Sequence, residues 1–305
     1  MANGGACAMA HELDRILRAF AARAWAIDPE RGLEIAEALA LRHANGPRAE
    51  PFRADGSAPR GQTQRSASVA VIPLQGPLAP RVTSMQDVSA GFTSVSAFIE
   101  TFREAEASAQ VDRIVLDVDS PGGMVDLVPE AAAMVRASRK PVTAVANTTA
   151  ASAAYWIASQ AGRFYASPSA TVGSIGVRAM HQDLSGALKQ RGIAVTHIHA
   201  GPRKVEGNPY QPLDKAARAA LQAEVDEAYA AFVADVAAAR GVGEAVVRAD
   251  PEATAQHFGG GRAYGAATAA RLGMVDGVMT LDAAIAEARG GGRGVRAERE
   301  RLALI

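Results

Sequence analysis

The sequence predicts an α/β fold, in which crossover helices join the strands of a parallel sheet. Segments rich in β-branched residues alternate with segments whose apolar residues recur at helical spacing, and this alternation is typical of βαβ units. Glycine-rich turns follow expected strands, at the edge where such sheets hold their functional sites. The chain has 305 residues, 49% hydrophobic and 21% charged, which is enough for one such core with an appended segment.

The elements of this core are expected from about residue 66 onward. We expect strands at 69–72, 114–118, 142–145 and 195–199, and helices at 95–107, 128–137, from Ser152, at 213–240 and at 264–272. Strands and helices alternate along the chain, as they do in a sheet of parallel strands.

The composition changes on both sides of this core. Residues 1–44 have apolar residues at helical spacing on either side of Pro29, which predicts a short helical N-terminal segment. Residues 45–66 are rich in Gly, Pro, Arg and Ser and predict a flexible linker. Residues 67–289 form the predicted main domain, and the Gly/Arg-rich residues 290–305 are expected to be a disordered tail.

Charge and cysteine content exclude several classes of protein. Lys and Arg number 32, as do Asp and Glu, so we expect protein or small-molecule partners and no nucleic acid. The single cysteine, Cys7, has no partner for a disulfide, and no Cys/His cluster has zinc-ligand spacing; this predicts a cytoplasmic protein without metal or cofactor. Polar residues interrupt the uncharged stretch between Lys140 and Arg163, and no signal sequence is recognisable, so we expect no membrane anchor.

A glycine turn follows the strand expected at 114–118. It reads Asp119-Ser120-Pro121-Gly122-Gly123, and its glycines allow the backbone to point N–H groups into a cleft, as an oxyanion hole requires. Pro-Gly is also the usual dipeptide of a type II turn. The motif by itself therefore leaves both interpretations open.

Ser152 begins the helix that follows the strand expected at 142–145. Small residues surround it, and its hydroxyl would lie at the positive end of the helix dipole, a suitable place for a nucleophile. The alternative is that Ser152 only caps the helix.

Lys204 lies in a loop, Gly201–Tyr210, after the strand expected at 195–199. The other lysines of the chain, Lys140, Lys189 and Lys215, lie in or next to expected helices. An amine acts as a base near neutral pH only where desolvation lowers its pKa, and a bound substrate or a neighbouring subunit could provide that desolvation. The alternative is a solvated loop cation.

Several motifs, in the same order, closely resemble the protease IV/signal peptide peptidase A family. The resemblance covers about Val69 to Ala284 and rests on Ser120–Gly123, Ala151–Ala158, Thr171–Val177, the Lys204 loop and Ala269–Asp276. It implies a Clp/crotonase-type fold and a serine peptidase.

The resemblance also implies roles for individual residues. Ser152 would be the nucleophile and Lys204 its general base, the N–H groups of Gly123 and Ala153 would form the oxyanion hole, and Gly122 would contact the substrate. The chain departs from the family in having Ala153 and Ala154 where glycines are usual; alanine still supplies the N–H, but the cleft floor should be narrower.

Two features favour the head-maturation proteases of lambda-like tailed phages within this family: the expected helical start, and the loop Gly207–Tyr210. This resemblance implies scaffold, portal or capsid proteins as substrates and a location in the host cytoplasm or the prohead. It also implies a homo-oligomer in which Ser152 and Lys204 of one site come from adjacent subunits.

His181 is an alternative base. With Asp183 close by, it could form a Ser-His-Asp triad with Ser152, whereas His197 and His199 are expected to be structural.

The sequence also allows other functions. The chain could be a cytoplasmic signal peptide peptidase-like enzyme that degrades peptides, or a non-catalytic interaction module in capsid assembly. Enoyl-CoA hydratases share the fold, but the acidic catalytic residues that they need are not recognisable.

Overall fold

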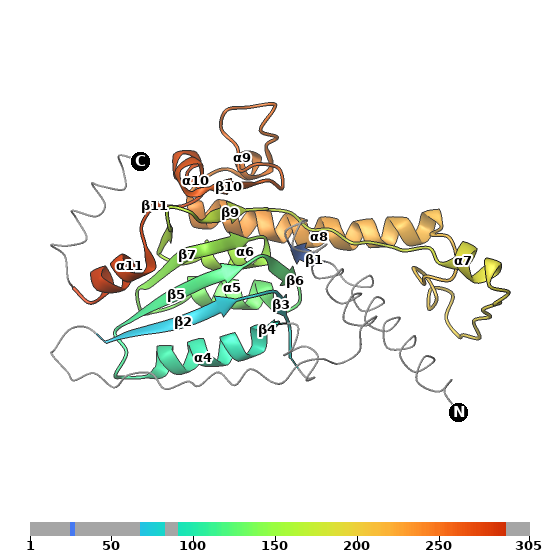
Figure 1. The fold of residues 1–305 in the computed structure, drawn as a ribbon, viewed down its shortest axis with the longest axis horizontal. Helices are drawn as coiled ribbons and strands as arrows, with labels where there is room; N and C mark the ends of the chain where they lie inside the picture. Colours follow the sequence, from blue (N-terminus) through green and yellow to red (C-terminus); the bar gives the residue numbers. More distant parts are fainter. Residues whose placement is uncertain (1–24, 28–67, 83–90, 291–305) are drawn as a thin grey trace.

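The computed structural model describes residues 25–27, 68–82 and 91–290 (Figure 1). Its main sheet has seven strands: β10-β9-β7-β5-β2 in that order, with β8 paired to β7 and β11 paired to β8. Only β10 pairs antiparallel, so the predicted α/β fold with a mostly parallel sheet is confirmed. The strands are β2 Val69–Gln75, β5 Arg113–Ser120, β7 Val142–Ala151, β8 Arg163–Ala166, β9 Thr171–Gly173, β10 Ala263–Gly265 and β11 Gly277–Val278.

Helices cover both faces of this sheet. The larger core includes Leu116 and Val118 of β5 and joins them to buried residues of α4 (Val95–Ala107), α5 (Val128–Arg136) and α6 (Ala153–Ala158). On the other face, Val145 of β7 packs with residues of α11 (Leu281–Ala288). Successive side chains of a strand point to opposite faces, so neighbours such as Ala144 and Val145 contribute to different cores.

Most of the expected elements are confirmed. The helix expected at 95–107 is α4, whose first turn is capped by the Ser94 hydroxyl accepting from Ala97 N–H at 3.2 Å. The strand expected at 142–145 is longer than expected, because β7 continues to Ala151 and ends directly at Ser152. The remaining helices are α7 Ser185–Gln190, α8 Lys215–Arg240, α9 Glu244–Arg248 and α10 Ala266–Leu272.

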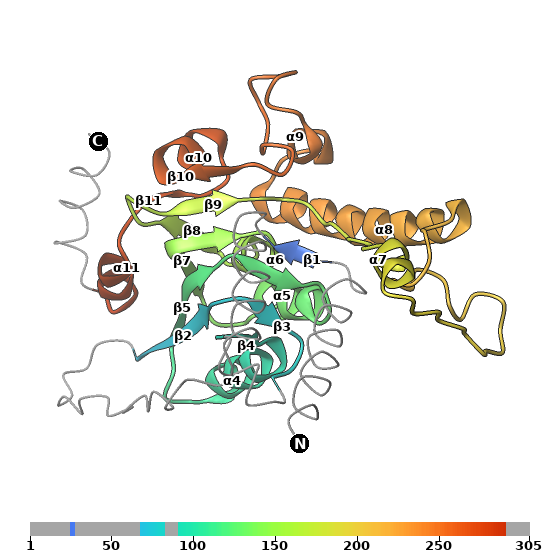
Figure 2. The ribbon, with the colours of Figure 1, turned by 45° about the vertical axis from the view of Figure 1, so that its right-hand side comes forward.

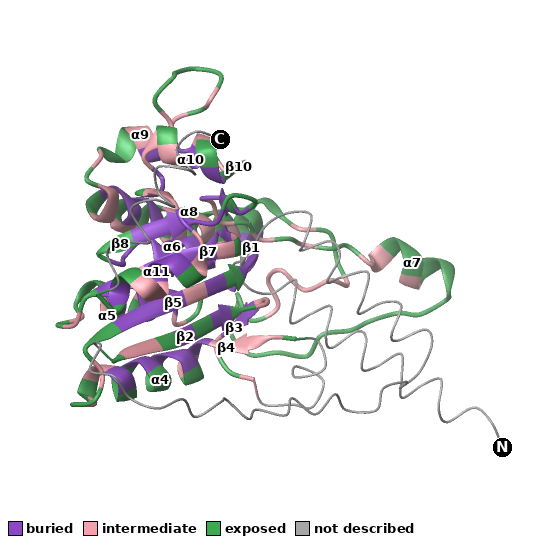
Figure 3. Cartoon of the chain, turned by 60° about the vertical axis from the view of Figure 1, so that its left-hand side comes forward, coloured by how far each residue is buried: buried purple, intermediate pink, exposed green. Residues whose placement is uncertain are grey.

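Residues 178–228 project from the sheet and its helices, and we call this segment the arm (Figures 1 and 2). It contains α7 and the first half of α8. Only the second half of α8 contributes a buried cluster to the core, with Phe232, Val233, Val236 and Ala237. Most of the arm is exposed, in contrast to the buried strands (Figure 3).

The prediction of a strand at 195–199 is wrong. These residues lie on the arm without regular secondary structure, and Ile198 is 98% exposed. Alternating apolar and polar residues produced the prediction, but a strand needs a hydrogen-bonded neighbour, and no described strand pairs with this segment. Lys204 therefore does not follow a strand of the sheet.

A second, small sheet has the order β1-β6-β3-β4, with β1 Trp25–Ile27, β3 Leu78–Ala79, β4 Thr93–Ser94 and β6 Gly122–Met124. Within the predicted helical segment 1–44, residues 25–27 thus form a strand, and the rest of that segment lies outside the described residues. The predicted linker 45–66 and residues 291–305 of the predicted tail also lie outside them.

Candidate active site

Ser152 lies at the junction between β7 and α6 in a strained backbone conformation, with φ 55° and ψ −120°. Its N–H donates to Gly173 O at 2.8 Å, which holds the junction against β9. The Ser152 hydroxyl donates to Gly176 O at 3.4 Å, and the residue is 1% exposed.

This conformation argues against a capping role. Ser152 occupies the position before α6, but its side chain makes no capping hydrogen bond. A non-glycine residue in such a conformation costs about 1–3 kcal/mol, and strain of this kind clusters at functional sites. A serine on a sharp strand-to-helix turn is also how α/β hydrolases present their nucleophile.

The glycine turn lies beside Ser152. Ser120 of the turn pairs with Ala150 of β7, and β6 contacts α6. Gly122 has φ 96° and donates its N–H to the Ser120 hydroxyl at 3.2 Å. The turn and Ser152 are therefore neighbours, as the predicted oxyanion hole requires.

Gly123 and Ala153, the predicted oxyanion donors, lie in confined surroundings. A Cβ on Gly123 would lie 2.0 Å from Leu78 O, so the approach of β3 excludes any larger residue there. Ala153 is fully buried at the first position of α6, where helix N–H groups have no acceptor within the helix.

A hollow of about 460 Å³ lies next to Ser152. Gly176, whose carbonyl accepts from the Ser152 hydroxyl, is among its lining residues, with Ser174 and Arg178 on the same segment and Asp226 and Tyr229 on α8. Its position beside Ser152 makes it a candidate pocket for a substrate side chain.

The structure does not bring Lys204 to Ser152 within one chain. Lys204 is exposed in the turn after Gly201 on the arm, where its N–H donates to Gly201 O at 3.2 Å. Ser152, Gly122, Gly123 and Ala153 lie together at one end of β6 and α6, whereas the loop between α7 and α8 lies on the projecting arm (Figures 1 and 2).

The alternative base His181, and the charged side chains of Asp183 and Lys140, have hydrogen-bond partners of their own. His181 Nε2 lies 3.0 Å from Asn208 O, within the arm. Asp183 bonds to Ser185, whose side-chain and backbone hydrogen bonds lower the pKa of the Asp183 carboxyl. Lys140 Nζ donates to the carbonyls of Ala105 and Ser108 at the end of α4.

Sequence reasoning did not assign Ser174 a role. It has φ 53°, the same unusual sign as Ser152, and it lines the hollow beside Ser152. Gly173 before it has φ 123°, so two successive residues turn the chain at this point. The sequence signal was available in Gly-Ser-Ile-Gly, since glycines beside a serine indicate a tight turn.

The described residues carry no group of three or more His, Cys, Asp or Glu side chains placed to hold a metal ion. None of the helices in the described ranges combines the length and the apolar character needed to span a bilayer.

The sequence matches Peptidase family S49 over residues 134–295, more than half of the chain, and the chain belongs to this peptidase family. The match begins in α5 and includes Ser152 and Lys204. The predicted resemblance to the protease IV/signal peptide peptidase A family is confirmed.

Curated relatives include two phage proteins. The chain is 37% identical to "Capsid assembly protease C" of Escherichia phage lambda over 59% of this chain and 41% of that protein. It is 34% identical to "Head-tail preconnector protein GP5" of Enterobacteria phage P21 over 62% of this chain and 38% of that protein. It is 29% identical to "Protease 4" of Salmonella typhi over 61% of this chain and 29% of that protein. The matched region thus spans less than half of each of these relatives.

Proposed function

We propose that the chain is a serine endopeptidase in which Ser152 is the nucleophile and Lys204 of a neighbouring copy is the general base. The observation that carries this proposal is the strained, non-capping conformation of Ser152 beside the glycine turn, in a chain of Peptidase family S49. Strain is retained where a fold holds a reactive group in position.

In the proposed reaction, Lys204 moves protons in both stages, the formation and the hydrolysis of an acyl-enzyme. As the Ser152 hydroxyl attacks the scissile carbonyl, its proton passes to the Lys204 amine, and the carbonyl oxygen becomes an oxyanion held by the N–H groups of Gly123 and Ala153. Lysine then gives the proton to the departing amine, leaving an acyl-enzyme on Ser152. A water molecule, deprotonated by the same lysine, then attacks the ester carbonyl, and the lysine returns this proton to the departing Ser152 oxygen, which releases the acid product and restores both groups.

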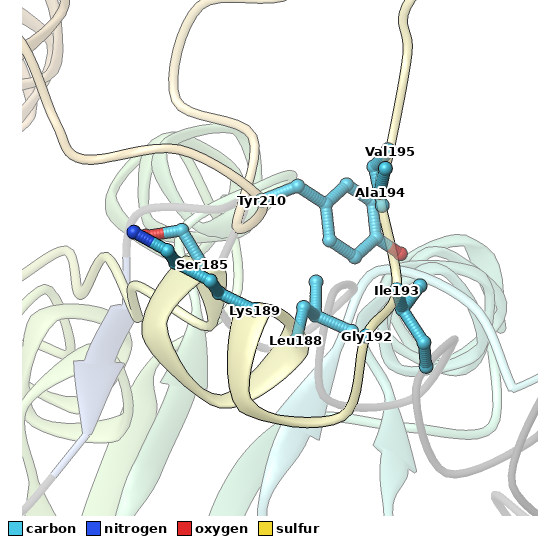
Figure 4. A pocket seen from close by; sticks show the side chains of 8 residues that line it. All are labelled: Ser185, Leu188, Lys189, Gly192, Ile193, Ala194, Val195 and Tyr210. Carbon is cyan, nitrogen blue, oxygen red and sulfur yellow. The ribbon is translucent and has the colours of Figure 1, made fainter.

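The arm supports a site shared between copies. Lys204 lies on a projecting segment that also exposes Ile193, Val195 and Ile198, an unusual surface for an isolated chain. At the same end, a hollow of about 360 Å³ opens between α7, residues 192–195 and Tyr210 (Figure 4). A second copy covering this surface would bury its apolar side chains and desolvate the Lys204 amine.

The proposed substrates are scaffold or portal proteins of a phage or prophage head. The printed names of the lambda and P21 relatives, a capsid assembly protease and a head-tail preconnector protein, support this choice. An enzyme that degrades peptides in the manner of signal peptide peptidases is the second candidate, supported by the relative named Protease 4. In either case we propose that the protein works in the cytoplasm, and the phage enzyme within the prohead.

The first experiment measures cleavage of an unfolded test protein by the wild type, Ser152→Ala, Lys204→Ala and His181→Ala. Ser152→Ala and Lys204→Ala are each expected to lose at least about a thousandfold in rate, while His181→Ala retains activity. An active Lys204→Ala together with an inactive His181→Ala would replace the dyad with a triad. If no form cleaves while all are folded, a non-catalytic module in capsid assembly becomes the better proposal.

Mixing two inactive variants tests whether the site is shared. In an assembly formed from equal amounts of Ser152→Ala and Lys204→Ala, about a quarter of the sites combine an intact serine with an intact lysine of the neighbour. Activity should therefore reappear after the two are unfolded and refolded together. Each variant refolded alone is the control. Continued inactivity of the mixture, with an active wild type refolded in the same way, would show that each copy supplies its own base.

A further inference from the structure

Residues 25–27 lie on the edge of the strand that carries the predicted oxyanion donor. β1 pairs antiparallel with β6, so that Trp25 is opposite Met124, Ala26 opposite Gly123 and Ile27 opposite Gly122. β6 is also paired on its other side, where Leu78 of β3 is opposite Gly123. β1 thus occupies the one edge of β6 that β3 leaves available.

This edge lies beside the nucleophile. β6 follows Ser120, which pairs with Ala150 two residues before Ser152, and it contacts α6, the helix that begins after Ser152. In Figure 1, β1 lies next to β6. Ser152 itself is 1% exposed.

An extended peptide binds a strand edge through the backbone N–H and C=O groups of that edge. The groups of Gly122–Met124 that would hold a peptide are those that pair with residues 25–27. A strand edge pairs with one neighbour at a time. Consequently β1 and a peptide substrate compete for the same place.

We propose that residues 25–27 form an internal blocking strand, which occupies the peptide-binding edge of β6 and must leave before a substrate binds. This inference rests on the proposed function, because it takes β6 to be the edge that binds the scissile peptide. The occupant is a segment of this chain that lies along the edge as a strand. Its residues, Trp-Ala-Ile, are uncharged.

The mechanism predicts a specific kinetic change. A blocking strand lowers the fraction of molecules open to substrate, and the apparent affinity falls by that fraction. Weakening the strand should therefore lower KM and leave kcat unchanged. Tethering to the same chain provides an effective concentration on the order of millimolar, so a gain of about tenfold or more in apparent affinity is expected.

The test uses the full chain with the double substitution Trp25→Pro/Ala26→Pro. Alternate N–H groups of an antiparallel strand face the neighbouring strand. Of two successive residues, one therefore donates to β6, and two successive prolines remove that N–H whichever of the two it is. The matched control is Ala49→Pro/Glu50→Pro, in the predicted linker. Binding is measured in a Ser152→Ala background by fluorescence anisotropy, with a labelled peptide of residues 21–31 of this chain as the probe.

Tighter binding of the peptide by the Trp25→Pro/Ala26→Pro protein, by about tenfold or more, with the linker control equal to the parent, supports the blocking strand. Equal affinity in all three, or no measurable binding to any, overturns it. Cleavage of the wild-type chain within residues 24–28 would also overturn it, since the strand would then be a substrate.

Failure of the blocking strand can be distinguished from failure of the proposed peptidase function. If no form cleaves an unfolded protein, the peptidase proposal fails, while the peptide-binding measurement still decides whether β1 blocks the edge of β6. If the wild type cleaves and the prolines change neither KM nor peptide affinity, the blocking strand fails alone.

Discussion

The indole of Trp156 donates from Nε1 to Asp235 Oδ2 at 2.8 Å and thereby ties α6 to α8. The Trp156 ring also stacks on Phe232 of α8, with centroids 4.6 Å apart and planes at 4°. Arg136 of α5 completes the junction by donating to Asp235 Oδ1 at 2.6 Å. The helix that follows Ser152 and the helix that carries the arm are therefore held as one unit.

Loss of the Asp235 carboxylate should destabilise this junction. Asp235→Ala leaves the Trp156 N–H buried without an acceptor, which should lower the free energy of unfolding by about 2–3 kcal/mol. Denaturant unfolding measures the change, with Glu224→Ala on an exposed position of α8 as the control. Equal stability of the two variants would contradict a role for the Trp156–Asp235 bond.

Gly123 should not tolerate a side chain. In Gly123→Ala the Cβ would overlap the Leu78 carbonyl, and the chain must shift at the predicted oxyanion hole, at a cost of about 3 kcal/mol or more. Gly162→Ala is the matched control, because its Cβ would lie 3.6 Å from Val142 O, an ordinary contact. Thermal unfolding of both variants tests this, and a Gly123→Ala protein as stable as the control would refute the close approach of β3.

Asp117 should make stability depend on pH. Burial raises the pKa of this carboxyl above its ordinary 3.8, the negative charge of Asp119 adds to the rise, and Oδ1 is buried without a partner among the described residues. The folded state holds the Asp117 proton more tightly than the unfolded state does. The contribution of this proton to the free energy of unfolding is therefore complete below pH 3.8 and is lost as the pH rises through the raised pKa.

Asp117→Asn removes this titration. The variant should be more stable than the parent near neutral pH, and the difference should shrink as the pH falls toward 3.8. Guanidinium unfolding at several pH values measures it, with the exposed Glu100→Gln of α4 as the control. A stability difference that does not change with pH would contradict the raised pKa.

Ile198 should contribute to assembly. Its 98% exposed side chain lies on the arm, which also carries Lys204, so Ile198→Glu is expected to reduce the mass of the proposed oligomer, measured by light scattering, and to reduce cleavage with it. Val71→Glu, at a position 41% exposed on β2, is the control and should keep both. An unchanged mass and activity in Ile198→Glu would exclude this part of the arm from the interface.

The elements that the sequence predicted well are those that depend on near neighbours. Helix α4 has the predicted bounds. Its apolar residues recur at helical spacing after the capping residue Ser94, as Phe98, Ile99 and Phe102. The glycine turn and the serine were likewise recognisable, since each follows a run of residues typical of a buried strand. Their meeting at one edge follows from the parallel pairing of β5 and β7.

The α/β alternation, the glycine turn and the place of Ser152 at a strand-to-helix junction were thus predictable from local patterns in the chain. Three features emerged from the three-dimensional arrangement instead: residues 195–199 lie on an arm and not in the sheet, Lys204 is held away from Ser152 in one chain, and residues 25–27 pair with β6. Helical and strand periodicity are local properties, whereas a strand exists where a distant segment supplies its hydrogen bonds.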